Sequence, residues 1–246
     1  MSSSRKRPRS GSARENNATR CELINSSAPF ARGAFRNVYK GRYTIGERAG
    51  QLCVAKMFKA GSVFEASFFD HDVQVVDKAL EIIDRWNDEG LVNKSVVLNR
   101  PTVWTNEDDG EKALVEPFIQ NWEKFNSNSG WANHETPWHL VMQALSHFSY
   151  HVTGGQCVLC DLQGGVYADG VVLTDPVILS RNQMYGPTDL GARGISTFFA
   201  KHTCNEYCRG HWQQPRDQQA YFRPQMGTSM VRANVPTRHS RPRMTY

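Results

Sequence analysis

The sequence predicts an α+β fold with two lobes, and three observations support this class. Two short strands over 38–45 and 52–58 open the body of the chain, and an amphipathic helix over 66–87 follows them. More strands, and then a mixture of helices and strands, come after this helix, an order typical of α+β proteins. The 246 residues suffice for one domain or for two lobes that share a cleft.

Hydrophobic periodicity predicts the elements of the first half. The opening strands are indicated by alternating polarity in the first and by a short apolar run in the second. Two further strands are expected around 96–104 and 113–118, with the acidic turn 106–110 between them. Apolar residues three or four apart predict the helix, which is expected to stop near Gly90; they are Phe69, Val73, Val76, Leu80, Ile83 and Trp86.

A second helix is expected after a polar loop at 121–135. Thr136 is a suitable N-cap, and Pro137 fits the first turn of a helix. The apolar face of this helix would consist of Trp138, Val141, Leu145 and Phe148.

The last part of the body is predicted to contain a hairpin and a short helix. A strand over 157–162 is expected to turn through 168–170 into a strand over 171–175. A loop with several glycines, 186–194, then leads into the short helix.

Both ends of the chain are basic. Residues 1–20 contain six cations and one acid, and residues 211–246 contain six arginines and one aspartate. Each end contributes +5 to a total of +5, so the body at 21–210 has a charge of −5. This acidic body argues against a nucleic-acid-binding face. We expect a disordered arm over 1–20 and a flexible tail over 211–246.

The same features predict the cellular setting. No stretch approaches the roughly 18 apolar residues of a membrane span, so no membrane partner is expected. The six cysteines and the absence of a signal peptide favour a reducing, cytoplasmic setting and metal binding over disulfides. The basic run over 5–9 has the composition of a nuclear import signal, so a nuclear setting is the alternative to a cytoplasmic one.

The densest group of metal-ligand side chains is His202, Cys204 and Cys208, for which zinc is the natural metal. A structural zinc site needs a fourth ligand, and helical position favours His147 or His151. The full set of candidates is His147, His151, Cys157, Cys160 and His211. The alternative is that both cysteines of the cluster are small buried hydrophobic residues.

Cys157 and Cys160 also form a C-x-x-C pattern. They lie in an apolar run with strand character, where the two side chains would point to opposite faces. We therefore interpret both as core residues.

Lys56 is a lone cation at the end of an apolar strand. Burying its ammonium group is costly unless an anion meets it, and a nucleotide phosphate would do so. The segment 33–37, with Arg36 as a second cation, could cover that phosphate. Alternatively, the lysine side chain extends from the strand end to solvent.

Asp161, Gln163 and Asp175 are expected at the ends of two paired strands. Their oxygens suit Mg²⁺, which is usually bound through one or two carboxylates and the phosphates of a substrate. Turn and capping roles are the alternative.

Two common nucleotide-binding signatures are absent from the sequence. The frame Gly-x-x-x-x-Gly over 186–191 is followed by Ala192 and Arg193, so it is not a P-loop. The triplets His-Arg-Asp and Asp-Phe-Gly do not occur either, which excludes a conventional protein kinase.

Four motifs occur in order: Cys-Asp-Leu-Gln-Gly over 160–164, Leu-Thr-Asp-Pro over 173–176, the frame over 186–191, and His-x-Cys-x-x-x-Cys over 202–208. Together they resemble the alpha-kinase family over about residues 30–210. This resemblance implies an atypical serine/threonine protein kinase with an ATP cleft between two lobes and a zinc site in the C-terminal lobe. The implied lobes cover 21–115 and 116–210.

The resemblance also implies residue roles. Lys56 matches the phosphate-binding lysine, and Gly33 and Arg36 lie in the glycine-rich loop. Glu116 falls where the family hinge meets the adenine. The implied zinc ligands are His147, His202, Cys204 and Cys208, which decides against His151.

The remaining roles concern catalysis. Asp161 matches the catalytic aspartate, Gln163 the metal-binding glutamine, and Asp175 a second active-site aspartate. The connection over 164–170 is longer than usual for the family.

The implied activity is transfer of the ATP γ-phosphate to Ser or Thr of protein substrates, with ATP, Mg²⁺ and Zn²⁺ as cofactors. One rival interpretation is a pseudokinase or scaffold that binds ATP. A second is a zinc-dependent nucleic-acid binder that uses both basic tails.

Overall fold

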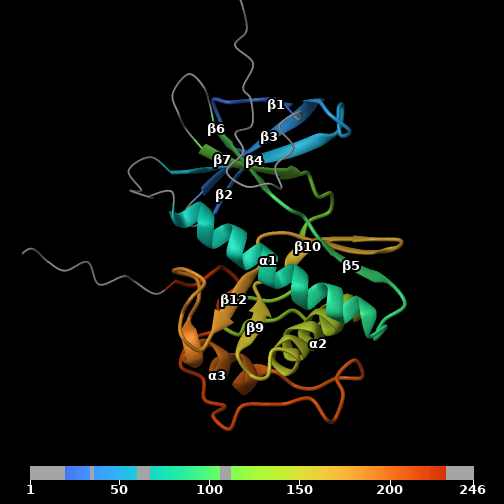
Figure 1. Ribbon diagram of the computed structural model, residues 1–246, viewed down its shortest axis with the longest axis vertical. Helices are drawn as coiled ribbons and strands as arrows, with labels where there is room; N and C mark the ends of the chain where they lie inside the picture. The colour runs from blue at the N-terminus through green and yellow to red at the C-terminus, as the bar shows by residue number, and fades with distance from the viewer. Residues whose placement is uncertain (1–19, 34–35, 60–66, 106–111, 231–246) are drawn as a thin grey trace, which may run out of the picture.

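The protein is described by a computed structural model that covers residues 20–33, 36–59, 67–105 and 112–230, and it has two lobes (Figure 1). The N-terminal lobe is an antiparallel sheet in the order β1-β3-β4-β7-β6, with β2 paired to β3. Its strands are β1 (Arg20–Leu23), β2 (Ala31–Arg32), β3 (Arg36–Ile45), β4 (Leu52–Phe58), β6 (Thr102–Thr105) and β7 (Lys112–Pro117).

Strand β4 lies in the middle of this sheet and places Lys56. In the register of the sheet, Lys56 pairs with Val38 of β3 and with Leu114 of β7. Cys53 and Ala55 belong to the core of the N-terminal lobe. Because neighbouring side chains of a strand point to opposite faces, Lys56 leaves the sheet on the other side from Ala55. The side chain of Lys56 therefore faces the second lobe.

The C-terminal lobe contains the helices and two smaller sheets. One sheet has the order β5-β11-β10-β8, and the other pairs β12 with β9. No helix of the described ranges is long and apolar enough to span a membrane. The elements are α1 (Ser67–Asp88), β5 (Ser95–Leu98), β8 (Glu123–Lys124), α2 (Pro137–Val152), β9 (Cys157–Cys160), β10 (Gln163–Tyr167), β11 (Gly170–Leu173), β12 (Val177–Ser180) and α3 (Gly191–Lys201).

Helix α1 and strand β5 belong to the C-terminal lobe, although the lobe boundary at 115/116 placed them in the first. The apolar face of α1 packs in one core with α2, β9 and β11. Strand β5 pairs in parallel with β11. The expected strand over 96–104 is therefore two strands in different sheets, β5 and β6. The chain enters the C-terminal lobe a second time after Pro117, the end of β7.

The expected strand over 157–162 is shorter than predicted, and a separate strand in another sheet follows it. Strand β9 pairs with β12 and ends at Cys160, whereas β10 begins at Gln163 and pairs with β11. The turn through 168–170 is confirmed, but it joins β11 to β10 and not to the expected strand over 157–162, because β9 pairs with β12 instead. Cys157 and Cys160 are both buried and lie in different core clusters, which confirms that they are core residues on opposite faces.

Helix α2 begins where the sequence predicts it. Thr136 is the N-cap and Pro137 occupies the first turn. The backbone N–H of Thr136 donates to Nδ1 of His139 at 3.0 Å, so a histidine completes the cap.

The expectation of a flexible tail is not met for residues 211–230. Trp212 is only 6% exposed and packs against Trp86 of α1 and Phe148 of α2. Burial of a tryptophan outweighs the cost of ordering a few polar neighbours. Residues 1–19 and 231–246, for which an arm and a tail were expected, lie outside the described residues, as does the acidic turn 106–110.

Candidate active site and metal centre

A cleft of about 250 Å³ lies between the two lobes. Side chains of both lobes line it, and residues far apart in the sequence meet there. The structure brings six of the expected site residues to this cleft: Gly33, Arg36, Lys56, Asp161, Gln163 and Asp175.

The ammonium group of Lys56 is the centre of an ionic cluster. Its Nζ lies 2.5 Å from Oε1 of Glu116 and 2.6 Å from Oδ2 of Asp175, and it donates to Oγ1 of Thr174 at 3.0 Å. Burial by itself disfavours the charged ammonium, but attraction by Asp175 and Glu116 outweighs it and raises the pKa of Lys56. Lys56 therefore stays a cation in a buried position.

Glu116 is buried within the sheet, and its carboxylate is turned toward Lys56. It also accepts a hydrogen bond from the Thr174 hydroxyl at 2.6 Å. Burial raises the pKa of Glu116 in spite of the nearby lysine. This carboxylate acts as a partner of Lys56, and a role of Glu116 next to the adenine stays a prediction.

Asp161 lies between β9 and β10 and is 1% exposed. Its carboxylate contacts Nζ of Lys124 at 2.9 Å, accepts from the backbone N–H of Asn128 at 3.3 Å, and accepts from the Thr228 hydroxyl at 2.7 Å. Burial raises the pKa of Asp161, although Lys124 and the hydrogen bonds act in the opposite direction. The carboxylate is thus a stronger base than a solvated aspartate.

Gln163 and Asp175 line the same cleft as Asp161. Nε2 of Gln163 donates to the backbone carbonyl of Asp175 at 3.1 Å, and Oε1 of Gln163 accepts from Lys124 at 3.3 Å. The Asp175 side chain remains 46% exposed. Burial favours its neutral form, but attraction by Lys56 dominates and lowers its pKa. An ionised, accessible carboxylate next to an amide oxygen suits a hard cation such as Mg²⁺.

Both aspartates adopt a backbone conformation that is uncommon for residues with a side chain. Their φ angles are 58° at Asp161 and 47° at Asp175, in the left-handed region. Such positions cost free energy and are concentrated at functional sites. Each of these two aspartates follows the end of a strand, and its carboxylate points into the cleft.

Arg36 forms an ion pair with Asp72 of α1 at the rim of the cleft. Its guanidinium group also lies 4.6 Å from the ring centroid of Phe58. Burial raises the pKa of Asp72 despite the arginine. The sequence analysis did not identify Asp72 as a site residue. Its carboxylate lies about one helical turn before Val75 and Val76 on an otherwise apolar helix face, and this position could have indicated a role.

Sequence reasoning also missed Lys124, Asn128 and Thr228. All three belong to parts of the chain that lack periodicity: Lys124 to the two-residue strand β8, Asn128 to the polar loop that follows it, and Thr228 to the C-terminal segment. Nothing local marks these residues, because their partner Asp161 lies at least 33 positions away in the sequence.

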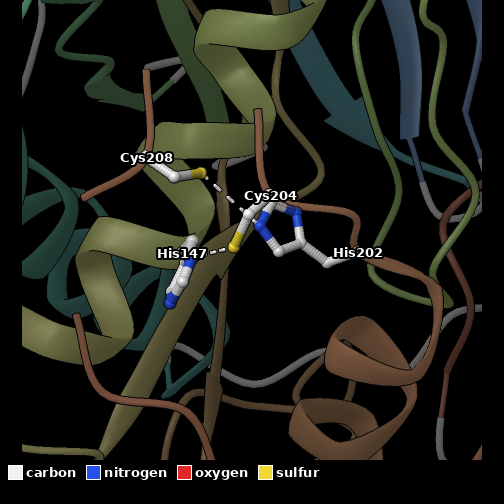
Figure 2. Close-up of side chains that lie close together, drawn as sticks. All are labelled: His147, His202, Cys204 and Cys208. Carbon is white, nitrogen blue, oxygen red and sulfur yellow. Dashed lines mark hydrogen bonds between the residues drawn. The ribbon is translucent and has the colours of Figure 1, made fainter. Parts of the chain in front are cut away.

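Four side chains in the C-terminal lobe form a group that could hold a metal ion (Figure 2). They are His147 of α2 and His202, Cys204 and Cys208, which follow α3, and their ligand atoms lie within 4.8 Å of one another. His151, the alternative ligand, lies outside this group and packs against His211.

The donor set fits zinc. Sγ of Cys204 lies 3.5 Å from Nδ1 of His147, and Sγ of Cys208 lies 3.7 Å from Nε2 of His202. Tetrahedral zinc with the usual bond lengths separates its ligands by about 3.3 to 3.8 Å. Nε2 of His147 lies 3.1 Å from the carbonyl oxygen of Gln213. This contact favours a proton on Nε2 and leaves Nδ1 free to bind a metal.

The pKa values of the same group suit metal binding. Burial lowers the pKa of His202 to about 4, so its imidazole is neutral near pH 7. Burial raises the pKa of Cys208 to about 11, so its thiol keeps its proton when no cation is present. A bound metal ion would replace that proton, which makes affinity depend on pH.

The chain is similar in sequence to known proteins. The model of the alpha-kinase family matches residues 31–208. The chain belongs to the alpha-kinase family. Alpha-protein kinase 1 of Dictyostelium discoideum is 34% identical over an alignment of 192 positions, which covers 76% of this chain and 14% of that protein. Human eukaryotic elongation factor 2 kinase is 29% identical over an alignment of 204 positions, which covers 78% of this chain and 27% of that protein.

Solved alpha-kinase domains have the same fold. An alpha-kinase from Entamoeba histolytica matches with a TM-score of 0.67 and 23% identity over 89% of this chain and 90% of that chain. The alpha-kinase domain of myosin-II heavy chain kinase A, solved in complex with AMP-PNP, matches with a TM-score of 0.66 and 22% identity over 77% and 86%. These findings confirm the resemblance derived from the motifs.

The chain spans only a fraction of its curated relatives, 14% of the first and 27% of the elongation factor 2 kinase. The matched part is the alpha-kinase domain. The regions that make up the rest of those proteins have no counterpart in this match.

Proposed function

We propose that the protein is an ATP-dependent serine/threonine protein kinase of the alpha-kinase type, which transfers the γ-phosphate of ATP to protein substrates. One observation above all supports this. Lys56 of the N-terminal lobe and Asp161, Gln163 and Asp175 of the C-terminal lobe line one cleft. Phosphoryl transfer requires little more from a protein than alignment of the reactants and stabilisation of charge.

In this proposal the cations of the N-terminal lobe hold the phosphates of ATP. Lys56 keeps its charge because two carboxylates surround it, and Arg36 is positioned at the rim by Asp72. Gln163 and Asp175 would hold Mg²⁺, which would neutralise part of the phosphate charge. Asp161 accepts the proton of the substrate hydroxyl, a role that suits its raised pKa.

We also propose that His147, His202, Cys204 and Cys208 bind a structural Zn²⁺. A closed site of four protein ligands leaves no open position for a substrate, which is typical of structural zinc. The site joins α2 to the segment after α3, so the metal would stabilise the C-terminal lobe and take no part in transfer.

The phosphate role of Lys56 can be tested without unfolding the protein. Lys56→Met alone leaves Glu116 as a buried charge without a cation, which can cost about 3 to 5 kcal/mol. The double variant Lys56→Met/Glu116→Gln removes both charges and retains an acceptor for Thr174. We expect it to fold and to lose at least about 100-fold in kcat, as when a preorganised charge-stabilising group is lost.

The readout is radiolabel transfer from ATP to a basic Thr-containing peptide, with thermal unfolding measured in parallel. Lys78→Met is the matched control, since it removes a partly buried lysine of α1 that pairs with Glu81 and does not line the cleft. Transfer by the double variant at the wild-type rate would contradict the assignment. A wild-type chain that binds ATP and transfers nothing would support the pseudokinase instead.

A further inference from the structure

A second cavity, of about 510 Å³, lies in the C-terminal lobe. It is formed where the C-terminal ends of α1 and α2 meet the chain that follows the metal group, and none of its lining residues lines the cleft. Its volume falls within the range of about 300 to 1,000 Å³ that is usual for small-molecule sites. The cavity is therefore large enough for a ligand of its own.

The cavity combines a rigid apolar part with accessible charged groups. Phe148 is 2% exposed and Trp212 is 6% exposed, and both belong to the core of the lobe. Arg85, Glu89 and Arg209 are exposed to solvent. A dissolved ligand can therefore reach the charged groups, while the core residues beside them stay fixed.

The two arginines of the cavity form no ion pair within the described part of the chain. Nη1 of Arg85 donates to the carbonyl of Val152 at 3.1 Å. Nη1 of Arg209 donates to the carbonyls of Glu206 at 3.3 Å and Cys208 at 3.4 Å. Backbone carbonyls position a guanidinium group without neutralising its charge. The other nitrogens of both groups are donors that these contacts leave free for an anion.

Two histidines of the cavity add further donors. The rings of His151 and His211 lie with their centroids 5.4 Å apart. Nδ1 of His151 accepts a hydrogen bond from the backbone N–H of Gln213 at 3.4 Å. This contact favours the tautomer with its proton on Nε2, so a neutral His151 still carries one N–H donor.

Glu89 is the one carboxylate among the lining residues. Two arginines and one glutamate give the cavity a charge of +1 before either histidine binds a proton. An excess of positive charge in a concave site attracts anions. The groups of this cavity therefore select for a negatively charged ligand.

We propose that this cavity binds a small metabolite with at least two negative charges, either phosphorylated or dicarboxylic, through Arg85 and Arg209. A guanidinium group binds phosphate and carboxylate alike through two parallel hydrogen bonds. Arg85 belongs to α1, whereas Arg209 follows the metal group, so a ligand bound to both joins these two parts of the lobe. The inference does not depend on the proposed kinase function.

One residue connects this cavity with the metal group. The backbone N–H of Gln213 donates to His151, and its carbonyl oxygen lies 3.1 Å from Nε2 of His147. A ligand that holds Arg209 also restrains the chain between Cys208 and Gln213. We therefore expect bound ligand to raise the unfolding temperature.

The test measures binding to the full chain by isothermal titration calorimetry, with inorganic phosphate, ribose 5-phosphate and succinate as probes at constant ionic strength. We expect one dianion per chain and a higher unfolding temperature, which sodium chloride at the same ionic strength does not produce. Tighter binding of ribose 5-phosphate than of succinate would assign the phosphorylated class, and the reverse order the dicarboxylic class. Absence of binding by all three probes would overturn the inference.

Variants of the lining residues locate the bound anion. Arg85→Gln/Arg209→Gln should weaken binding at least about 10-fold, because hydrogen bonds between charged groups are the strong ones. Arg48→Gln is the matched control, since Arg48 is an exposed arginine of the N-terminal lobe that lines neither cavity. Equal affinities of these two variants would overturn the inference. If the arginine double variant fails to fold, Glu89→Gln decides: tighter binding supports the site, and unchanged or weaker binding contradicts it.

Binding in the cleft is distinguished by Lys56→Met/Glu116→Gln, which lacks the central cation of the cleft. This variant should bind the probes as the wild type does, even though it is expected to lose phosphoryl transfer. Loss of binding in this variant alone would place the anion in the cleft and overturn the inference. Failure of the kinase proposal leaves these binding measurements unaffected.

Discussion

Lys124 contacts two residues that line the cleft, and these contacts indicate its role. Its ammonium group lies 2.9 Å from Asp161 and 3.3 Å from Gln163, so it touches both the proposed base and a proposed metal ligand. A cation in this position lowers the pKa of Asp161, whereas burial raises it, and burial dominates. Lys124 therefore limits how far the pKa of the base rises.

This balance predicts the pH dependence of transfer. Asp161 must be ionised to accept a proton, so activity should fall as the pH drops through its raised pKa. Lys124→Met removes the attraction that favours the carboxylate, and the acid limb of the pH profile of kcat/KM should move to higher pH. Lys78→Met, which changes a lysine of α1 that does not line the cleft, should leave the limb in place. An unmoved limb in Lys124→Met would argue against Asp161 as the base.

The two aspartates of the cleft, Asp161 and Asp175, are placed there by the ends of strands. Strands β9 and β10 are consecutive in sequence but belong to different sheets, and the left-handed turn at Asp161 separates them. Strand β11 ends in the same way before Asp175. A carboxylate at the end of a strand projects beyond the sheet, where it can reach a ligand between the lobes.

The close contact between β10 and β11 leaves no room for a side chain at Gly164. A Cβ atom at this position would lie 2.0 Å from the backbone oxygen of Val172 in the partner strand. Gly164→Ala must therefore separate the two strands, at a cost of about 1 to 3 kcal/mol for overpacking. We expect a lower unfolding temperature and reduced transfer, because Gln163 precedes this residue.

Gly210→Ala is the matched control for this change. A Cβ atom there would meet nothing within 4 Å, so its effect should stay within about 0.5 kcal/mol. Equal unfolding temperatures of the two variants would show that the hairpin tolerates a side chain.

In the whole molecule, the metal group connects α2 to the chain that follows α3. Structural zinc supplies about 10 to 16 kcal/mol in small modules, more than the net stability of about 5 to 15 kcal/mol of a typical domain. We expect His147→Ala to lose zinc and to give unfolded or insoluble protein. His151→Ala, one turn further along the same helix, should retain zinc. Soluble, active His147→Ala protein without metal would contradict a structural zinc.

The segment after the metal group is also part of the core. Trp212 contacts Trp86, His147 and Phe148, so Trp212→Ala should destabilise the protein by about 3 to 5 kcal/mol, as large-to-small core changes do. Trp122 is 53% exposed, and Trp122→Ala should have a much smaller effect on chemical denaturation. Similar midpoints for the two variants would mean that the segment contributes little to stability.

The sequence by itself determined the individual elements and the residue types at the site. A short apolar run predicted β4 and the position of Lys56 in it, and helical periodicity predicted α1 to within a residue at each end. Cluster spacing indicated three of the four metal-group residues. The fourth, His147, came from the family resemblance, because spacing alone could not separate it from His151. These patterns are readable because they repeat over a few neighbouring residues.

Tertiary structure alone decided which elements share a sheet and which side chains meet. It assigned β5 to β11, paired Glu116 with Lys56, and brought Lys124 and Thr228 to Asp161. Lys56 and Asp175 are 119 positions apart, and no local pattern records a contact of that range. Such contacts depend on which apolar faces are buried together, and that is settled only when the chain packs as a whole.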